Sequence, residues 1–372
     1  MKTALIHDWL VNYSGSERCL ESFVNIWKDA DVFTLVDFLN HEERNTILKG
    51  KHARTSFIQK LPFAEKHHRQ YLPLFPLAIE QFDLKNYNVI LSSSHAVAKG
   101  VLVNPDQLHI TYCHTPMRYA WDLYHQYLRE SNLEKGIKAF FVKRALHRLR
   151  IWDVISSGRV NYFVANSKYI ARRIEKIYNR KADVIYPPVD VDTFTFKESK
   201  ENYYLTASRF VPYKRVDLIV EAFSKMPDKK LLVIGDGPQE SRIKSLAGKN
   251  IEFIGYQPPE NLRQYMQDAK AFVFAAEEDF GIVVVEAMAC GTPVIALGIG
   301  GTAETVINDV TGVHIKEQSA AGIIDAVNRF EDVKDKFDLK KIRMHSEQFS
   351  RQIFERNISD YVSQKSEHFF NQ

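Results

Sequence analysis

Short apolar runs alternate with amphipathic segments along most of the chain. In the first half, these runs predict buried strands at residues 3–6, 31–35, 89–91 and 109–112. A second series predicts strands at residues 203–207, 230–234, 251–254, 271–274 and 293–296. Helical periodicity occurs between strands, for instance over residues 18–27, 216–223 and 284–289. Strands that alternate with helices in this way predict an α/β fold with parallel sheets.

The clearest boundary in this pattern is a pair of prolines, Pro187 and Pro188. Proline imposes an extended backbone and offers no N–H group to a sheet, so we expect the chain to leave one sheet here. With 372 residues, the chain also exceeds what one hydrophobic core usually organises. We therefore expect two Rossmann-like domains, over residues 1–188 and 189–349. Such sheets bind ligands outside the carboxyl ends of their strands, which predicts a cleft between facing domains.

The composition is that of a soluble globular protein, with 45% hydrophobic and 26% charged residues. The three cysteines, Cys19, Cys113 and Cys290, are far apart and odd in number. They favour a reducing compartment over a disulfide framework or a cysteine zinc site. The first apolar run stops at His7 and is too short for a signal peptide. The longest uncharged stretch, residues 287–303, is interrupted by proline and glycine and does not predict a membrane-spanning helix.

The formal charge of +4 hides an asymmetry between the two halves. Residues 1–190 contain 27 Lys and Arg against 19 Asp and Glu, whereas the remainder contains 23 against 27. This predicts that only the first half contacts an anionic partner. Residues 52–84 and 129–150 interleave basic with apolar side chains. Each segment predicts either a helix with a core face and a solvated basic face, or a face lying on anionic lipid headgroups. A nucleic-acid partner is not expected, because no recognised motif accompanies the basic residues.

The strongest candidate site lies in the second half, around Glu278 and Glu286. A helix is expected to begin near Ile282, and the free backbone N–H groups at its start can hold polar or anionic oxygens. The two carboxylates are eight positions apart and can face one ligand from different depths of its binding site. Each can accept hydrogen bonds from a pair of sugar hydroxyls. The alternative is that Glu278 is a helix-start charge and Glu286 belongs to a solvated face.

Two basic residues follow the predicted strand at 203–207, namely Arg209 and Lys214. One forked guanidinium and one ammonium group suit the spread oxygens of a diphosphate. The alternative is an exposed basic loop. A tight turn at residues 235–238 follows the next strand, but it lacks both the dinucleotide glycine pattern and the Lys-Ser/Thr of a phosphate loop.

Candidate residues in the first half also follow predicted strands. Gly15, next to Ser16, allows close backbone approach in the loop after the first strand, and His114 follows the strand at 109–112. His114 can donate a hydrogen bond to a reacting oxygen, or it can be a satisfied polar residue without a further role. No metal-ligand spacing is present, so a metal-dependent mechanism is disfavoured.

Together these residues resemble the retaining GT-B glycosyltransferases of family 4, over nearly the whole chain. The marker is the Glu-x7-Glu motif from Glu278 to Glu286. Further similar segments are SRFVPYK (208–214), VIGDGP (233–238), NSKYIARRIEKIY (166–178) and VIYPPVDVDTF (184–194). YCHTPMRYAWD (112–122) and ALIHDWL (4–10) resemble the mannosyltransferase branch that builds bacterial O-antigen and capsule polysaccharides.

The resemblance implies a role for each matching residue in the second half. Arg209 and Lys214 would neutralise the departing donor diphosphate. Glu286 would bind the nucleotide ribose hydroxyls. Glu278 would hold the hydroxyls of the donor sugar, together with the backbone of residues 280–282.

In the first half, the resemblance places His114 over the donor sugar and lets the loop at Gly15 approach the diphosphate. Ser16 departs from the family pattern, in which a second glycine commonly follows. The final segment, with apolar residues at helical spacing from Phe349 onward, would be the GT-B helix that crosses back to the first domain, here residues 350–372.

The function implied is a retaining transfer of a hexose, mannose from GDP-mannose, to a glycan linked to polyprenyl diphosphate in surface polysaccharide synthesis. No metal or cofactor is expected, since the leaving phosphate itself takes the acceptor's proton. The protein would be cytoplasmic and peripheral on the inner face of the cell membrane. The alternatives are a UDP-sugar donor, or a non-catalytic nucleotide-sugar-binding subunit. A nicotinamide-dependent oxidoreductase is weakened by the missing G-x-G-x-x-G after the first strand.

Overall fold

The computed structural model describes residues 1–371, apart from the side chain of Glu130. The chain forms two compact units, the first comprising Met1–Pro187 with Phe354–Gln372 and the second Pro188–Ile353. The change of unit after Pro187 lies one residue from the boundary expected from the two prolines. The last helix, α15 (Arg351–Phe370), starts in the second unit and belongs to the first from Phe354 onward.

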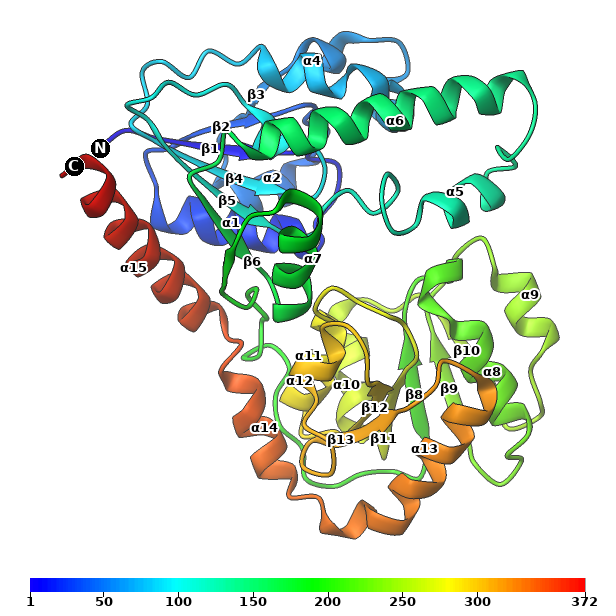
Figure 1. The fold of residues 1–372 in the computed structure, drawn as a ribbon. Coiled ribbons are helices and arrows are strands. Elements are labelled where there is room, and N and C mark those ends of the chain that lie inside the picture. The colour runs from blue at the N-terminus through cyan, green and yellow to red at the C-terminus, as the bar shows by residue number, and fades with distance from the viewer. Residues whose placement is uncertain (372) are drawn as a thin grey trace. The chain divides into compact units, whose positions relative to one another are not determined.

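A sheet of seven parallel strands forms the centre of the first unit (Figure 1). In spatial order the strands are β3 (Arg54–Thr55), β2 (Asp31–Thr34), β1 (Thr3–His7), β4 (Val89–Ser94), β5 (Leu108–Cys113), β6 (Tyr162–Ala165) and β7 (Ala182–Val184). In β1, Leu5 is in register with Val32 of β2 on one side and with Leu91 of β4 on the other. The order reverses between β1 and β4, which makes the carboxyl ends of these two strands the expected ligand position.

Helices cover both faces of this sheet because alternate strand residues point in opposite directions. Ala4 and Ile6 pack against α4 (Phe75–Glu80) and α6 (Ile137–Ser157). Leu5 points the other way. It lies in a core with α1 (Gly15–Ile26), α2 (His41–Leu48) and α15. A smaller cluster holds α7 (Lys168–Tyr178) against β6.

The two basic segments of the first half differ from each other in structure. Residues 52–84 are not one helix, as the sequence pattern suggested, but a series of short pieces. After β3 these are η1 (Phe57–Lys60), α3 (Ala64–His67), η2 (His68–Leu74) and α4. Proline explains the interruptions, since Pro62 lies between η1 and α3, Pro76 lies in the first turn of α4, and Pro73 inside η2 removes a helical donor. In the second segment, α5 (Tyr124–Glu130) ends early and α6 is a helix of 21 residues.

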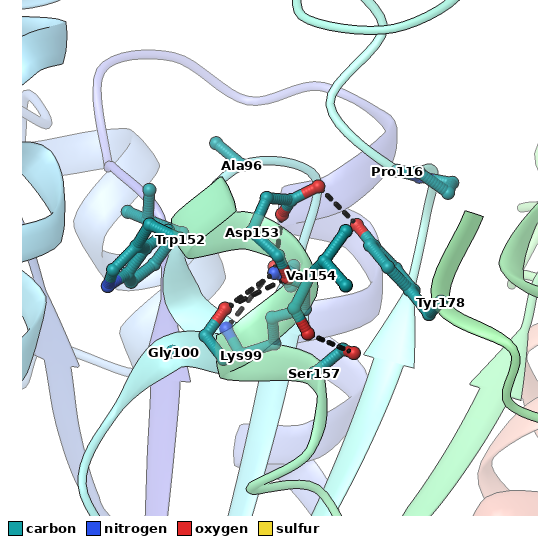
Figure 2. Close-up of polar contacts among 12 residues, drawn as sticks. Ala96, Lys99, Gly100, Pro116, Trp152, Asp153, Val154, Ser157 and Tyr178 are labelled. Carbon is teal, nitrogen blue, oxygen red and sulfur yellow. Dashed lines mark hydrogen bonds and ion pairs between the residues drawn. The ribbon is translucent and has the colours of Figure 1, made fainter. Parts of the chain in front are cut away.

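A buried polar cluster fixes α6 to the loop after β4, as Figure 2 shows around Lys99, Asp153 and Tyr178. The Lys99 ammonium group forms an ion pair with Oδ1 of Asp153 and donates to Oγ of Ser156 at 3.1 Å. Oδ2 of Asp153 accepts hydrogen bonds from Nε1 of Trp121 at 2.8 Å and from the hydroxyl of Tyr178 at 2.9 Å. Because both charges are fully buried, these additional donors are needed to offset the loss of hydration.

The second unit contains six parallel strands and has the doubly wound strand order. In spatial order they are β10 (Ile251–Gly255), β9 (Leu231–Ile234), β8 (Tyr204–Ala207), β11 (Ala271–Phe274), β12 (Val294–Leu297) and β13 (Gly312–Ile315). One face packs against α8 (Val216–Ser224), α9 (Glu240–Ser245) and α13 (Ala320–Val333). The remaining helices of the unit are α10 (Pro259–Asp268), α11 (Ile282–Ala289), α12 (Thr302–Thr305) and α14 (Leu339–Glu347), and α11 contacts each of the other three.

The predicted architecture is confirmed by these two sheets: each unit is a Rossmann-like domain, and the last helix packs on the first. In the second unit the strand order reverses between β8 and β11. The candidate residues Arg209 and Lys214 follow β8, and Glu278 follows β11. The fold therefore brings both sequence motifs of this half to one ligand-binding edge.

Candidate functional site

Lys214 and Glu278 meet at the carboxyl edge of the second sheet. Lys214 ends the short turn η4 (Pro212–Lys214) after β8, and its Nζ contacts Oε1 of Glu278 in the loop after β11. The side chains are 22% and 16% exposed, so both charges remain within reach of solvent and of a ligand. Sequence reasoning assigned these residues to different parts of a ligand, and the structure places them in direct contact.

Arg209 lies in the loop between β8 and η4 and is exposed. Within residues 1–371 its guanidinium group makes no hydrogen bond or ion pair. The loop itself is rigidly held, since Phe210 is buried and its N–H donates to the carbonyl of Asp236 at 2.6 Å. The arrangement therefore offers a forked cation on a fixed backbone, which suits an anionic ligand.

The turn at residues 235–238 supports this loop. A Cβ atom on Gly235 would lie 1.9 Å from the carbonyl oxygen of Ser208, so only glycine lets the two segments approach this closely. Gln239 adds a backbone hydrogen bond to the carbonyl of Phe210 at 3.0 Å. The turn that sequence analysis considered as a weak phosphate loop thus packs against the backbone on either side of Arg209.

The loop that carries Glu278 is held by a second glycine-rich segment. The N–H of Gly301 donates to the carbonyl of Glu278 at 2.7 Å, and Gly300 forms an isolated bridge with the same residue. A Cβ atom on Gly301 would lie 2.4 Å from the carbonyl oxygen of Asp279. Sequence analysis used these glycines only to exclude a membrane span. Their position next to the Glu278 loop could not be inferred without the order of β11 and β12.

Glu286 lies deeper than Glu278. It occupies the fifth position of α11, a helix that begins at Ile282 after Gly281 in a left-handed conformation. Residue Glu286 is only 5% exposed, so its assignment to a solvated face is wrong. Phe280, before the helix, is also buried and packs edge-on against Phe349. The helix start provides N–H groups without intrahelical acceptors, next to the Glu278 loop.

In the first unit, His114 belongs to a chain of buried polar side chains. It follows β5, and its Nε2 lies 2.8 Å from Oγ of Ser93 at the end of β4. The same hydroxyl lies 3.1 Å from Nδ1 of His7 at the end of β1. Nε2 of His7 in turn lies 3.3 Å from Oε1 of Glu17 in α1. The residues that sequence analysis missed here are Ser93 and Glu17, because no motif marks them.

The His114 ring is neutral at physiological pH. Burial disfavours its cation and lowers its pKa to about 3, and the neighbouring rings of His95 and His7 act in the same direction. A strongly perturbed pKa at the carboxyl edge of a Rossmann-like sheet is typical of functional sites. Nε2 of His114 is hydrogen bonded, which fits the alternative of a satisfied polar residue. Nδ1 makes no hydrogen bond within residues 1–371, which fits the prediction that the ring acts on a ligand.

Asp8 fixes the loop that follows β4. Its carboxylate accepts the backbone N–H groups of residues 95–98 at 2.6, 2.9, 2.6 and 2.7 Å. Burial opposes the ionisation of Asp8, but the charge of His95 and these hydrogen bonds outweigh it and lower its pKa. The switch point between β1 and β4 is thereby rigid and negatively charged at its base.

Gly15 and Ser16 form the first turn of α1, which begins three residues earlier than the predicted helix. The helix starts here because Oε2 of Glu17 accepts a hydrogen bond from the N–H of Ser14 at 3.2 Å, the reciprocal contact of a capping box. The hydroxyl of Ser16 donates to the same oxygen at 3.0 Å. A ligand at this turn would therefore meet the backbone of residues 15 and 16, since the Ser16 hydroxyl is already engaged.

Three further features concern metal ions, cysteines and membrane-spanning helices. Within residues 1–371, no three His, Cys, Asp or Glu side chains are grouped so as to hold a metal ion. All three cysteines are buried, and none of them forms a disulfide within residues 1–371. No helix in the described part of the chain is both long and apolar enough to span a bilayer.

Two family models match the chain in succession. The model described as Glycosyltransferase Family 4 matches residues 14–193, and that described as Glycosyl transferases group 1 matches residues 191–344. The two matches meet at residues 191–193, a few residues beyond the change of structural unit after Pro187.

Curated relatives match over part of their length. An uncharacterized glycosyltransferase of Methanocaldococcus jannaschii is 30% identical over 183 residues, which is 48% of this chain and 51% of that protein. A D-inositol 3-phosphate glycosyltransferase of a Mycobacterium species is 32% identical over 178 residues, which is 41% of this chain and 40% of that protein. The chain thus spans about half the length, or less, of these relatives.

Solved structures resemble the whole chain. Anabaena HepE in complex with UDP has a TM-score of 0.71 at 18% identity, and the match covers 98% of this chain and 100% of HepE. Sucrose-phosphate synthase from Thermosynechococcus elongatus has a TM-score of 0.73 at 16% identity, with 98% and 99% covered. At these identities the likeness concerns the fold.

The two sheets, their switch points and these structural neighbours define a protein of the GT-B fold. The family models together match residues 14–344, and the chain belongs to the glycosyltransferases, with the family 4 domain in its first unit and the group 1 domain in its second.

Proposed function

We propose that this protein is a retaining hexosyltransferase that binds its nucleotide-sugar donor on the second unit. The observation that carries the proposal is the Lys214–Glu278 pair at the switch point, beside the unpaired guanidinium of Arg209. Lys214 and Arg209 bind the donor diphosphate and stabilise its charge as the glycosidic bond breaks. Glu278 accepts hydrogen bonds from the sugar hydroxyls, and the deeper Glu286 accepts those of the ribose. The backbone of Phe280, Gly281 and Ile282 donates to the ligand.

The donor we propose is GDP-mannose, on the resemblance of residues 112–122 and 4–10 to bacterial polysaccharide mannosyltransferases. A uridine donor is the alternative, and it is favoured by the structural neighbour HepE, which was solved with UDP and with UDP-glucose. Thermal shift distinguishes the two, because a ligand at a hundred times its dissociation constant stabilises the folded state by about 2.7 kcal/mol. GDP-mannose should raise the melting temperature, and UDP-glucose at the same concentration should not.

For the acceptor we propose a glycan linked to polyprenyl diphosphate at the inner membrane face. This proposal is supported by the basic first half and by α6, which carries several Lys and Arg residues and exposes large apolar side chains. A peripheral enzyme can reach an acceptor whose lipid stays in the bilayer. The absence of a metal requirement also stays a prediction, and transfer in the presence of EDTA tests it.

Sugar transfer by the purified protein tests the proposed function directly. Lys214→Ala and Glu278→Ala should each lower kcat by about 10²–10³-fold, the usual effect of removing one group that stabilises developing charge. The matched control is Lys270→Ala, since Lys270 forms an ion pair of similar exposure with Glu331 at 2.8 Å elsewhere in the second unit. Full activity in either site variant would contradict the assigned role. Donor binding by the wild type without transfer or hydrolysis would instead indicate a non-catalytic binding subunit.

A further inference from the structure

Phe280, which lies just before helix α11, is held from two sides. On the side of its backbone, a Cβ atom on Gly301 would lie 2.4 Å from Cα of Phe280, so only a glycine fits there. On the side of its ring, Phe280 meets the ring of Phe349 at 5.4 Å and an angle of 72°. The two residues are 3% and 2% exposed. Because an edge-on pair has a preferred geometry, Phe349 fixes the orientation of the Phe280 ring as well as its position.

A second contact leads from Phe349 to the far end of α12. The ring of His345 in α14 lies 5.6 Å from the ring of Phe349, and its Nε2 lies 2.8 Å from the carbonyl oxygen of Thr305. Because a carbonyl oxygen can only accept, this nitrogen carries a proton and donates the hydrogen bond. Thr305 ends α12, the helix that Gly301 precedes. The contacts therefore close a circuit that runs from Phe280 over α12 and back.

The part of α14 behind this circuit is itself fixed. Nη1 of Arg343 donates to the carbonyl oxygen of Ala289, the last residue of α11, at 3.0 Å, where a cation also complements the helix dipole. The same nitrogen donates to the carbonyl oxygen of Val191 at 2.7 Å. The carbonyl oxygen of Phe349 accepts the N–H of Val189 at 2.9 Å. All of these residues belong to the second unit, so the arrangement involves that unit alone.

The circuit adjoins the two backbone segments to which we assign the donor. The N–H of Gly301 donates to the carbonyl of Glu278 at 2.7 Å, and Gly281, directly after Phe280, precedes the first turn of α11. A shift of the Phe280 ring would therefore move both the Glu278 loop and the N–H groups at the start of the helix. A ligand binds more tightly when such groups are already held in the arrangement that it requires.

We propose that Phe349 and His345 are positioning residues of the donor site, which hold the Glu278 loop and the start of α11 in the conformation that binds the nucleotide sugar. Sequence analysis used Phe349 only as the first apolar position of the last helix, and it gave His345 no role. The ligand side of this inference rests on the proposed glycosyltransferase function. The positioning itself does not, because it is a property of the unliganded second unit.

Phe349→Leu is the first site variant, because leucine is apolar and fills much of the same volume but has no ring edge to meet Phe280. The matched control is Phe330→Leu. Phe330 is 1% exposed in the core with α8, α9 and α13, where its ring lies 5.7 Å from that of Phe337. The same atoms are lost from a buried aromatic pair of the same unit, so the general loss of stability should be similar.

His345→Ala is the second site variant. His345 is only half-buried, so this change removes the hydrogen bond to Thr305 with little loss of core. It keeps the inference testable if Phe349→Leu folds poorly.

Hydrogen exchange in the unliganded full-length protein tests the positioning. The reporters are the amide of Gly301, which donates to Glu278, and the amide of Val284, which donates to the carbonyl of Gly281 at 3.0 Å. Because local opening sets the exchange rate, both amides should exchange at least about tenfold faster in the two site variants than in the control. A rate in either site variant no higher than in the control would overturn the inference, whether or not the protein binds a nucleotide sugar.

Isothermal titration calorimetry tests the ligand side, with whichever of GDP-mannose and UDP-glucose raises the melting temperature of the wild type. The Kd should rise at least about tenfold in both site variants and change less than about twofold in the control, because only the site variants lose the held arrangement. Wild-type affinity in both site variants would refute the role in donor binding. An equal loss in the control would refute it too, since the effect would then follow the stability of the second unit.

A wild type that binds neither nucleotide sugar would contradict the proposed function instead. The hydrogen-exchange rates would then decide the positioning by themselves, so failure of the proposed function and failure of this inference give different results.

Discussion

At the residue scale, the contact between Lys214 and Glu278 explains how two charged groups are accommodated at the edge of a sheet when no ligand is bound. In the free protein, the ammonium group and the carboxylate neutralise each other's charge. A partly exposed ion pair contributes only about 0–1 kcal/mol, so a diphosphate can replace Glu278 as the partner of Lys214 at little cost. Under the proposed function, the carboxylate thereby becomes available to the sugar hydroxyls when the diphosphate arrives.

The ion pair of Lys99 and Asp153 has the opposite character, because neither side chain is accessible to solvent. Asp153→Asn would leave the Lys99 charge buried and unpaired, which costs about 3–5 kcal/mol. We therefore expect this variant to lower the free energy of unfolding of the first unit by that amount, measured by urea denaturation. Tyr178 would lose a charged acceptor as well, and the raised pKa of its hydroxyl, caused first by burial and then by Asp153, should fall.

The comparison variant for this prediction is Asp325→Asn. Asp325 forms an i,i+4 pair with Arg329 at 2.9 Å on the surface of α13, where one such pair contributes about 0.3–0.5 kcal/mol. A similar loss of stability in both variants would show that burial does not decide the energetics of these pairs.

At the element scale, the apolar pattern predicted all the inner strands except β6, but it missed the strands at three of the four sheet edges. β3 has two residues and β7 has three, and β13 ends the second sheet. Strands with one open side need no continuous apolar run, and the residues of β3 and β7 are at most half-buried. The candidate site was predictable as motifs, because Arg209, Lys214 and Glu278 follow strands in the sequence and Glu286 lies in the helix after Glu278. Their meeting was not, since it depends on the strand order.

We predict that helix α6 binds to the surface of anionic membranes. Ile137, Phe140 and Phe141 at its start are 81%, 63% and 63% exposed. They alternate with basic residues, among them Lys138, Lys143, Arg144 and Arg148. We expect the protein to bind anionic vesicles at low salt and to be released at high salt, in a sedimentation assay. Replacing Phe140 and Phe141 by alanine should weaken this binding at least about tenfold, because each phenyl ring that leaves water contributes about 1.5–3 kcal/mol.

Tyr256→Ala serves as the matched control, since Tyr256 is an aromatic residue of the second unit that is 70% exposed. It should leave vesicle binding unchanged. Equal binding of the wild type to vesicles of neutral phosphatidylcholine would contradict the electrostatic part of the proposal.

At the scale of the whole molecule, each unit has its own core and its own switch point, but the chain crosses between them twice. The first crossing follows Pro187, and the second lies within α15. Helix α15 is therefore part of the second unit at Arg351, where it pairs with Asp190 at 2.8 Å, and part of the first from Phe354. Helical spacing in the sequence was sufficient to predict this helix. That it packs on the first unit was expected only from the resemblance to GT-B glycosyltransferases.

Phe354 is the residue on which the second crossing depends. Its ring lies 5.9 Å from that of Phe23 in α1 and 5.5 Å from that of Tyr112 in β5, and it is 1% exposed. Phe354→Ala leaves a cavity between a helix and the sheet, which costs about 3–5 kcal/mol. Because this cavity lies in the first unit, we expect faster hydrogen exchange in β1, β4 and β5 and unchanged protection in β8 and β11.

Phe370→Ala is the matched control, because Phe370 ends the same helix and is 39% exposed. It should change exchange little in either unit. Faster exchange in both units of the Phe354 variant would contradict independent stability. The two Rossmann-like units would then unfold together. Helix α15 would transmit the loss of stability from the core around Tyr112, two residues before His114, to the strands that position Lys214 and Glu278.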